Sequence, residues 1–327
     1  MNLSAGNNSQ QRKCELIRNV VSSFDNNDSG LMIIKSSNLI EFDPNASSLD
    51  LNHGRVERIE DLENMKNLKR LYLRWNLIKK IENLDTLHSL IELELCDNQI
   101  TKIENLDKLV NLEQLDISFN RLTTIENLML LIKLERLFLC ANRIKEIQNI
   151  ETLTNLVLLE LGDNQLRTIK NLDILIGLRY LYLGKNKIRK IENLEKLINL
   201  EVLSLQANRI RKIENLENLT KLTELYLSEN GIVVIENLEK LINLDTLDLA
   251  KNFLTDINNL ENQEKLNELW LNGNSIENWS CLTKLKENTN LRTIYLEENP
   301  LAKDKRYRAK LREQLPNLDQ IDATLCR

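Results

Sequence analysis

The chain is short of the residue types on which several protein classes depend. Among its 327 residues there are only 14 aromatic side chains (3 Trp, 6 Tyr and 5 Phe), so leucine and isoleucine must supply the packing. With 8 glycines and 3 prolines, the sequence is neither a low-complexity disordered chain nor a fibrous one. We expect no membrane span, because no stretch reaches the ~18 consecutive apolar residues that one requires. We expect no signal peptide, because the first residues are polar.

Residue types that carry chemistry are also scarce. The five cysteines are odd in number and none has C-x-x-C spacing, which favours a reducing, intracellular compartment. The two histidines, His53 and His88, have no nucleophile at a recognisable spacing, and no glycine-rich phosphate loop is present. We therefore expect no enzyme, no cofactor and no metal. The net charge of −5 argues against nucleic acid as a partner, because phosphate binding needs a basic surface.

What the sequence does contain is a repeat. An asparagine recurs every 22 residues, and one further asparagine, Asn299, follows the last of them after 25. The string I-E-N-L occurs six times, first at Ile81 to Leu84 and last at Ile235 to Leu238. Such a fixed period indicates a solenoid of stacked identical units. The recurring asparagines are Asn76, Asn98, Asn120, Asn142, Asn164, Asn186, Asn208, Asn230, Asn252 and Asn274.

Each unit contains L-x-x-L-x-L-x-x-N-x-I/L. The L-x-L part alternates, which predicts a short strand with its leucines facing inward. The asparagine amide both donates and accepts, so a column of asparagines can satisfy backbone groups where the chain leaves each strand. Apolar residues three apart in the remainder suit a 3₁₀ or short helical return. We predict an α/β leucine-rich-repeat solenoid of about 12 repeats, with a concave parallel sheet and a 3₁₀ or short helical convex side.

The two ends depart from the repeat. Residues 1–45 are polar and predict a flexible tail with one weak helix around Cys14 to Phe24. The solenoid is expected over residues 46–299. Its first turn, Leu49 to Leu62, is an atypical cap in which Gly54 replaces the asparagine.

Residues 300–327 are predicted to form a C-terminal helical cap. Asp304 can cap a helix on which Tyr307, Leu311 and Leu315 share one face, and Pro316 ends it. The six basic residues of this segment fit a solvated helix face, or alternatively a nuclear import signal or a phosphate contact. They are Lys303, Lys305, Arg306, Arg308, Lys310 and Arg312.

On each predicted strand, the residue between the two leucines should point out of the concave face. Across twelve repeats this column holds six aromatics, five acids and no base, although the whole chain has only 14 aromatics. Exposed aromatics among charges are typical of a protein-binding surface; alternatively, the rings only stack along the sheet and stabilise it. The column reads Asp50, Tyr72, Glu94, Asp116, Phe138, Glu160, Tyr182, Ser204, Tyr226, Asp248, Trp270 and Tyr295.

The sequences of the repeats and of the C-terminal segment are similar to those of a known family. The 22-residue type, the I-E-N-L returns, the run WLNGNSIENWSCL and the ending from Asn299-Pro300-Leu301 to Ile321-Asp322-Ala323-Thr324 resemble the leucine-rich-repeat regulatory subunit of type-1 protein phosphatase. The similarity runs from about Leu49 to the C-terminus, about 85% of the chain. A scaffold of another class with the same repeat and cap, spliceosomal or axonemal, is the alternative.

The resemblance implies a non-catalytic regulator, nuclear and cytoplasmic and tied to mitosis, that binds the phosphatase catalytic subunit through its concave face. It also implies a ternary complex with a small inhibitor protein. We expect no nucleic acid or membrane partner, and a monomer when the chain is free. The family's contact residues match Asp116, Phe138, Glu160, Asp248, Glu268, Trp270 and Tyr295, and Tyr182 stands where the family usually has Phe.

Overall fold

The computed structural model describes residues 33–34, 40–41 and 43–326. Most of the predicted tail, including the weak helix expected at Cys14 to Phe24, lies outside the described residues. Within the described part, the antiparallel pair β1 (Ile33–Ile34) and β2 (Ile40–Glu41) precedes the repeats.

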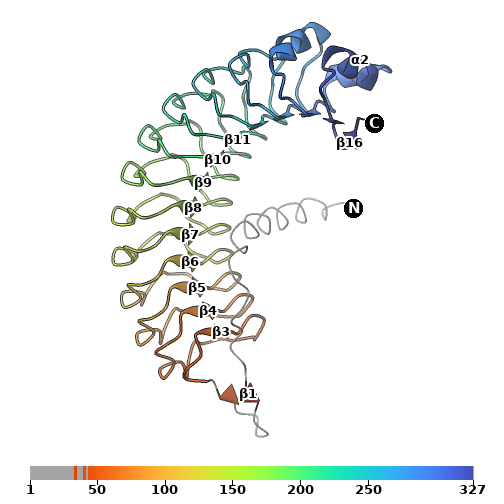
Figure 1. Ribbon diagram of the computed structural model, residues 1–327. Helices are drawn as coiled ribbons and strands as arrows, with labels where there is room; N and C mark the ends of the chain where they lie inside the picture. Colours follow the sequence, from red (N-terminus) through yellow and green to blue (C-terminus); the bar gives the residue numbers. More distant parts are fainter. Residues whose placement is uncertain (1–32, 35–39, 42, 327) are drawn as a thin grey trace.

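Twelve three-residue strands, one per repeat, stack in parallel into one sheet (Figure 1). Each pairs with the next in a fixed register, for example Leu49 with Leu71 and Leu71 with Leu93. The predicted concave parallel sheet of about twelve repeats is confirmed. The strands are β3 (Ser48–Asp50), β4 (Arg70–Tyr72), β5 (Glu92–Glu94), β6 (Gln114–Asp116), β7 (Arg136–Phe138), β8 (Leu158–Glu160), β9 (Tyr180–Tyr182), β10 (Val202–Ser204), β11 (Glu224–Tyr226), β12 (Thr246–Asp248), β13 (Glu268–Trp270) and β14 (Thr293–Tyr295).

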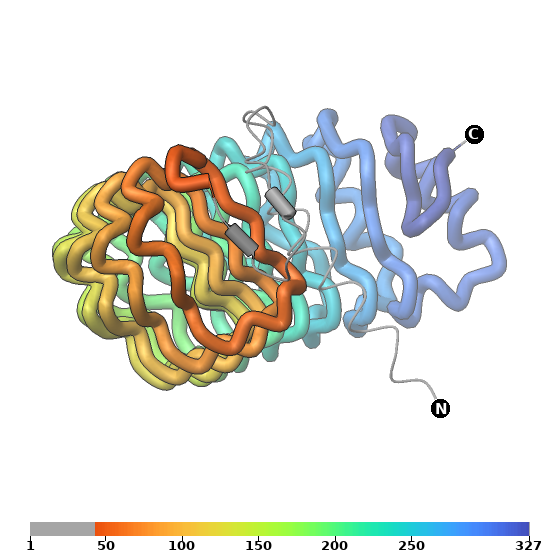
Figure 2. Tube along the Cα trace, turned by 90° about the horizontal axis from the view of Figure 1, so that it is seen from below, coloured from red at the N-terminus to blue at the C-terminus, as the bar shows by residue number. Residues whose placement is uncertain are grey.

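The core is a single column of leucine and isoleucine that runs the length of the solenoid. Each turn contributes the inward residue of its strand and the apolar residues of its return, and nearly all are fully buried. Figure 2 shows the successive turns lying one behind another, each closing on the same interior. Because every turn buries its apolar side only against its neighbours, the order of the whole array depends on this stacking.

The returns on the convex side are tight turns of 3₁₀ type. In each, two successive i→i+3 hydrogen bonds form, such as Leu87 N to Leu84 O and Leu90 N to Leu87 O, at 3.0 and 3.1 Å. Among the described repeats, only the lengthened one before Asn299 carries a longer 3₁₀ helix, η1 (Trp279–Glu287). These returns are wider than the sheet side, so the stack bends into the arc of Figure 1.

The recurring asparagines form the predicted ladder. Asn164 accepts a hydrogen bond from Ile144 N of the previous turn at 2.9 Å. Its Nδ2 donates to Leu139 O of that turn at 3.0 Å, and also contacts the carbonyls of Leu161 and Gly162 in its own turn. One side chain thus satisfies backbone groups that the strand leaves unpaired.

A second asparagine ladder lies on the returns, and the sequence pattern alone did not reveal its role. It is built by the asparagine of I-E-N-L and its equivalents, which adopt positive φ, as at Asn171 with φ 60°. Asn171 Nδ2 donates to Ile147 O of the previous turn at 2.8 Å. Asparagine suits this place because it tolerates the left-handed conformation and supplies a donor. The ladder comprises Asn83, Asn105, Asn127, Asn149, Asn171, Asn193, Asn215, Asn237 and Asn259.

The first turn has no ladder asparagine of its own. Asn76 in the second turn bonds to it as each ladder asparagine does to the turn before it, accepting from Val56 N at 2.9 Å and donating to Leu51 O at 3.0 Å. At Gly54 a Cβ would lie 3.0 Å from Leu51 O and 3.5 Å from Asn76 Oδ1. A side chain at this position would therefore be tight against the carbonyl oxygen of Leu51, while Asn76 would remain at an ordinary contact distance.

The C-terminal cap consists of η2 (Pro300–Lys303), α2 (Tyr307–Gln314), β15 (Gln320–Ile321) and β16 (Thr324–Leu325). Leu311 and Leu315, which the sequence placed on one helix face, are buried in the same core as Leu296. The N-cap of α2 is Arg306 rather than Asp304, whose Oδ1 accepts a hydrogen bond from Arg306 N at 2.8 Å in the preceding turn.

Asp322 completes the ladder at this end. Its Oδ1 accepts from Leu296 N at 2.9 Å and from Glu297 N at 3.0 Å. The hydroxyl of Tyr307 on α2 donates to the same oxygen at 3.2 Å. The last strand of the repeats and the cap helix are therefore tied through one carboxylate.

Candidate functional site

The concave face is formed by the strand residues on either side of each buried central leucine. The register aligns Asp116, Phe138, Glu160 and Tyr182 as neighbours on β6 to β9. It aligns Asp248, Trp270 and Tyr295 on β12 to β14, with Glu268 two residues before Trp270. The eight predicted contact residues therefore form two groups, separated by the strands β10 and β11.

The column is less exposed than the alternation predicted. Phe138 is only 6% exposed, and the carboxylate residues Asp116, Glu160 and Asp248 are 3%, 7% and 2% exposed. The expectation of full exposure is wrong for these four residues. Parallel strands lie ~4.8 Å apart, and the sheet curves toward this face. Side chains on adjacent strands therefore pack against one another and shield each other from solvent.

Two of the buried acids have a structural function. Asp116 Oδ1 accepts the backbone N–H of Ser118 at 2.8 Å, and Asp248 Oδ1 accepts that of Ala250 at 3.0 Å. Asp50 makes the same contact with Asn52 N at 2.9 Å. Aspartate at this position therefore closes a local turn where the chain leaves the strand, whatever else it binds.

The C-terminal group presents aromatic rings. The centroids of Trp270 and Tyr295 lie 5.4 Å apart at an interplanar angle of 56°, a favourable tilted contact. The hydroxyl of Tyr295 accepts a hydrogen bond from Gln320 Nε2 of β15 at 2.7 Å. Both rings are partly exposed. This end of the face is therefore an aromatic surface whose geometry is fixed by the contact between the rings and by the hydrogen bond to the cap.

The middle of the face carries two more tyrosines. Tyr182 is half-buried, and burial, followed by the nearby carboxylates Glu224 and Glu160, raises the pKa of its phenol well above the ordinary value. Tyr226 donates to Glu224 Oε2 at 2.7 Å. Both hydroxyls are therefore protonated donors at neutral pH.

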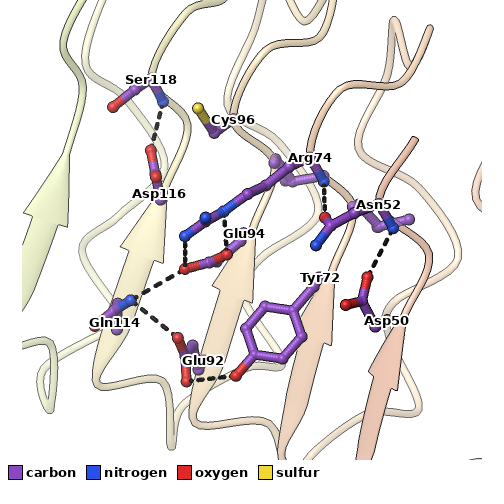
Figure 3. A network of polar contacts seen from close by, with 12 residues as sticks. Asp50, Asn52, Tyr72, Arg74, Glu92, Glu94, Cys96, Gln114, Asp116 and Ser118 are labelled. Atoms are coloured by element: carbon purple, nitrogen blue, oxygen red, sulfur yellow. Dashed lines mark hydrogen bonds and ion pairs between the residues drawn. The ribbon is translucent and has the colours of Figure 1, made fainter. Parts of the chain in front are cut away.

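A polar network covers the N-terminal strands (Figure 3). Arg74 Nη2 donates to Glu94 Oε1 at 2.5 Å, and Gln114 Nε2 donates to Glu92 Oε1 at 3.0 Å. The hydroxyl of Tyr72 donates to Glu92 Oε2 at 3.3 Å. The sequence reading missed Arg74, which belongs to a third outward column two residues beyond the aromatic and acidic one.

Glu94 should titrate near neutral pH. Burial raises the pKa of its carboxyl to about 7, while the charge of Arg74 opposes the shift and that of Asp116 adds to it. We expect carboxyl ¹³C NMR to show one glutamate with a pKa near 7, and this titration to vanish in Glu94→Gln.

The same shift affects stability. The pKa of Glu94 is about 7 in the folded protein and 4.5 as its ordinary value. Protonation of Glu94 therefore contributes its full stabilisation below pH 4.5, and this contribution is lost as the pH rises through about 7. Wild type should therefore lose melting temperature relative to Glu94→Gln across this interval. A constant difference between the two proteins would contradict the assignment.

In the rest of the described residues, the features relevant to chemistry or membrane insertion are the histidines, the candidate metal ligands and the helices. Both histidines lie on the surface, and His53 is stacked on Trp75 with 4.3 Å between the ring centroids. Among these residues no group of three or more His, Cys, Asp or Glu side chains is arranged to hold a metal ion. No helix in this part of the chain is long and apolar enough to cross a membrane.

Comparison with known proteins supports the repeat assignment. A family model for leucine-rich repeats in two copies matches residues 88–128, 176–218 and 220–262. An internalin from Listeria monocytogenes has a similar structure, with a TM-score of 0.70 and 29% identity over 86% of this chain and 87% of that one. The chain therefore has the leucine-rich-repeat fold.

The resemblance noted in the sequence is also confirmed over one segment. The chain is 54% identical over 52 residues to Protein phosphatase 1 regulatory subunit 7 of Xenopus tropicalis. It is 52% identical over 52 residues to the Homo sapiens protein of the same name. These segments are 16% of this chain, but they span only 15% and 14% of the two relatives' own lengths.

Proposed function

We propose that the chain is a non-catalytic regulatory subunit that binds the catalytic subunit of type-1 serine/threonine protein phosphatase through its concave face. The observation that carries the proposal is the identity of more than half the residues with the phosphatase regulatory subunits over 52 residues. The shape adds support, because twelve stacked strands at ~4.8 Å give a face of roughly 55 Å, enough for an interface of standard size.

The chemistry of the face suits a protein partner with basic groups. The pair Trp270 and Tyr295 provides large, rigid contact area, and aromatics of this kind are the usual centres of binding energy. The partly exposed carboxylate of Glu268 lies on the same strand face as Trp270. Tyr182, which is partly exposed, supplies further apolar area on β9, beyond the buried Phe138 of β7. A basic patch on the partner would complement the partly exposed carboxylates of Glu224 and Glu268.

Other expectations belong to the same proposal. We infer a nuclear and cytoplasmic location, a role in mitosis and a ternary complex with a small inhibitor protein. We also infer that the free chain is a monomer. The fold itself is compatible with a scaffold of another class, so that the identity of the partner is the point to test.

The direct test is a binding titration between the purified chain and the purified type-1 catalytic subunit. We expect a saturable complex with a Kd below about 1 µM, and much weaker binding to a type-2A catalytic subunit as the matched control. Absence of a complex at this concentration would overturn the proposal. A pull-down from lysate that enriches small ribonucleoprotein or dynein components instead would favour the alternative scaffold.

A further inference from the structure

A second surface of the solenoid has the opposite charge to the concave columns. It consists of the first and third residues after the ladder asparagine in five consecutive turns, from Asn120 to Asn208. Eight of these ten positions are Lys or Arg, the other two are Thr123 and Gln165, and none is acidic. We call this set the basic ridge: Arg121, Arg143, Lys145, Arg167, Lys187, Arg189, Arg209 and Arg211.

The backbone brings these residues side by side. In each turn they flank a buried Leu or Ile, such as Ile188 between Lys187 and Arg189, so both point outward. Successive turns are joined by hydrogen bonds at this level, such as Lys187 N to Leu166 O and Arg209 N to Ile188 O, each 2.8 Å. Lys187 is half-buried and the other seven side chains are exposed.

The charges of the ridge are uncompensated within the described part of the chain. None of its eight side chains has an acidic oxygen within 4.0 Å, whereas basic residues outside it, such as Lys170, Arg179 and Lys185, do form ion pairs. A row of eight unpaired cations is unusual in a chain whose net charge is −5. Such a row attracts an anionic ligand and speeds its association.

At its C-terminal end the ridge runs into exposed apolar side chains. The same four positions in the next two turns hold Gly231, Val233, Phe253 and Thr255. Val233 is 56% exposed and Phe253 is 62% exposed. The aliphatic stem of Arg211 lies against Gly231, where an added Cβ would be 3.2 Å from Arg211 Cγ. The cationic row and the apolar end therefore form one continuous surface.

We propose that the basic ridge binds an extended acidic segment of a partner protein, with an apolar side chain of that segment against Val233 and Phe253. Five turns at ~4.8 Å span roughly 20 Å, the length of about six residues of extended peptide. Carboxylates along the segment pair with the cations, and the apolar end fixes its direction.

Several features favour a peptide over nucleic acid. The ridge itself has no aromatic side chain on which bases could stack. In three of the five ridge turns the return begins with a glutamate, at Glu126, Glu192 and Glu214, and these carboxylates would repel a second phosphate strand. The ridge lies outside the concave columns, so it does not depend on the proposed phosphatase contact.

The test uses the full chain and a fluorescein-labelled peptide with a run of about six Glu and Asp residues followed by Phe and Leu. Fluorescence anisotropy should show saturable binding that weakens as salt is raised. The triple variant Arg167→Glu, Arg189→Glu, Arg211→Glu should bind at least about tenfold more weakly. The triple variant Lys108→Glu, Lys196→Glu, Lys240→Glu changes the net charge equally at exposed sites on the returns, and it should stay within about twofold of wild type.

Further arms separate the parts of the proposal. Phe253→Ser should weaken binding of this peptide but not of one ending in Ser-Ser. Equal losses in the two triple variants, or equal binding of a Gln and Asn version of the peptide, would overturn the proposal. Tighter binding of a single-stranded oligonucleotide with the same number of charges would also overturn it, because the ridge would then be a nucleic-acid surface.

Discussion

Trp270→Ala should weaken binding of the type-1 phosphatase catalytic subunit by roughly 2–4 kcal/mol, which is about 30- to 1000-fold in Kd. The indole is partly exposed on the concave face and is held against Tyr295 at 5.4 Å. Tyr295 is in turn fixed by Gln320 of the cap. A partner would therefore meet a rigid aromatic pair, and little conformational entropy is lost when such a pair is buried.

The alternative is that Trp270 and Tyr295 only shelter the end of the sheet. Because the rings are in contact, removal of the indole should cost about 0.5–1.5 kcal/mol of stability beyond the loss of buried area. Trp270→Phe keeps a ring beside Tyr295 and serves as the control for folding. If Trp270→Ala binds normally but melts much earlier than wild type, the residue is structural and the assignment is wrong.

The charge beside this pair gives an independent check on the same surface. Glu268→Lys reverses a partly exposed carboxylate on the strand face of Trp270. Its binding defect should be larger at low salt, since screening weakens interactions between exposed charges. The defect should be measured at two ionic strengths, and an effect independent of salt would argue against a basic surface on the partner.

Asn164→Ala should lower the free energy of unfolding by roughly 3–5 kcal/mol, because it leaves buried backbone groups without partners. Asn164 serves Ile144 N and three carbonyls in two adjacent turns. Asn155→Ala is the matched control, because Asn155 makes a single exposed hydrogen bond to Ile132 O at 2.9 Å. It should cost less than about 1 kcal/mol.

Urea titration of both variants, followed by circular dichroism, measures this difference. In a solenoid, loss of one ladder position can uncouple the turns on either side. The transition of Asn164→Ala should therefore also broaden, with a lower m value. If the two variants lose the same stability, the ladder is not what holds neighbouring turns together.

The period of the sequence predicted the strands almost residue by residue. Each strand begins one residue before the predicted L-x-L, or I-x-L in β14, and ends at its middle residue. The asparagine column bonds as its donor and acceptor chemistry requires. The second ladder was not predicted, because its basis is a positive φ at residues such as Asn171. A periodic string shows that a residue recurs, but not which backbone conformation makes it necessary.

The site was predictable in position but not in environment. Alternation correctly assigned Phe138 and Asp248 to the concave face, yet both are buried there. Their burial depends on how strongly the sheet curves and on which side chains flank them on adjacent strands. The ion pair of Arg74 with Glu94 was not predicted, because it joins residues of two different columns on neighbouring turns and the repeat pattern does not show which columns meet.

Site-specific photo-crosslinking tests the central claim most directly, namely that the concave face receives the phosphatase. Benzoylphenylalanine would replace Tyr182 on β9 in one protein, and Ile198, which is 53% exposed on the following return, in another. Each would be irradiated with the purified type-1 catalytic subunit. The account predicts a covalent adduct from position 182 and none from position 198. An adduct from position 198 alone would contradict it.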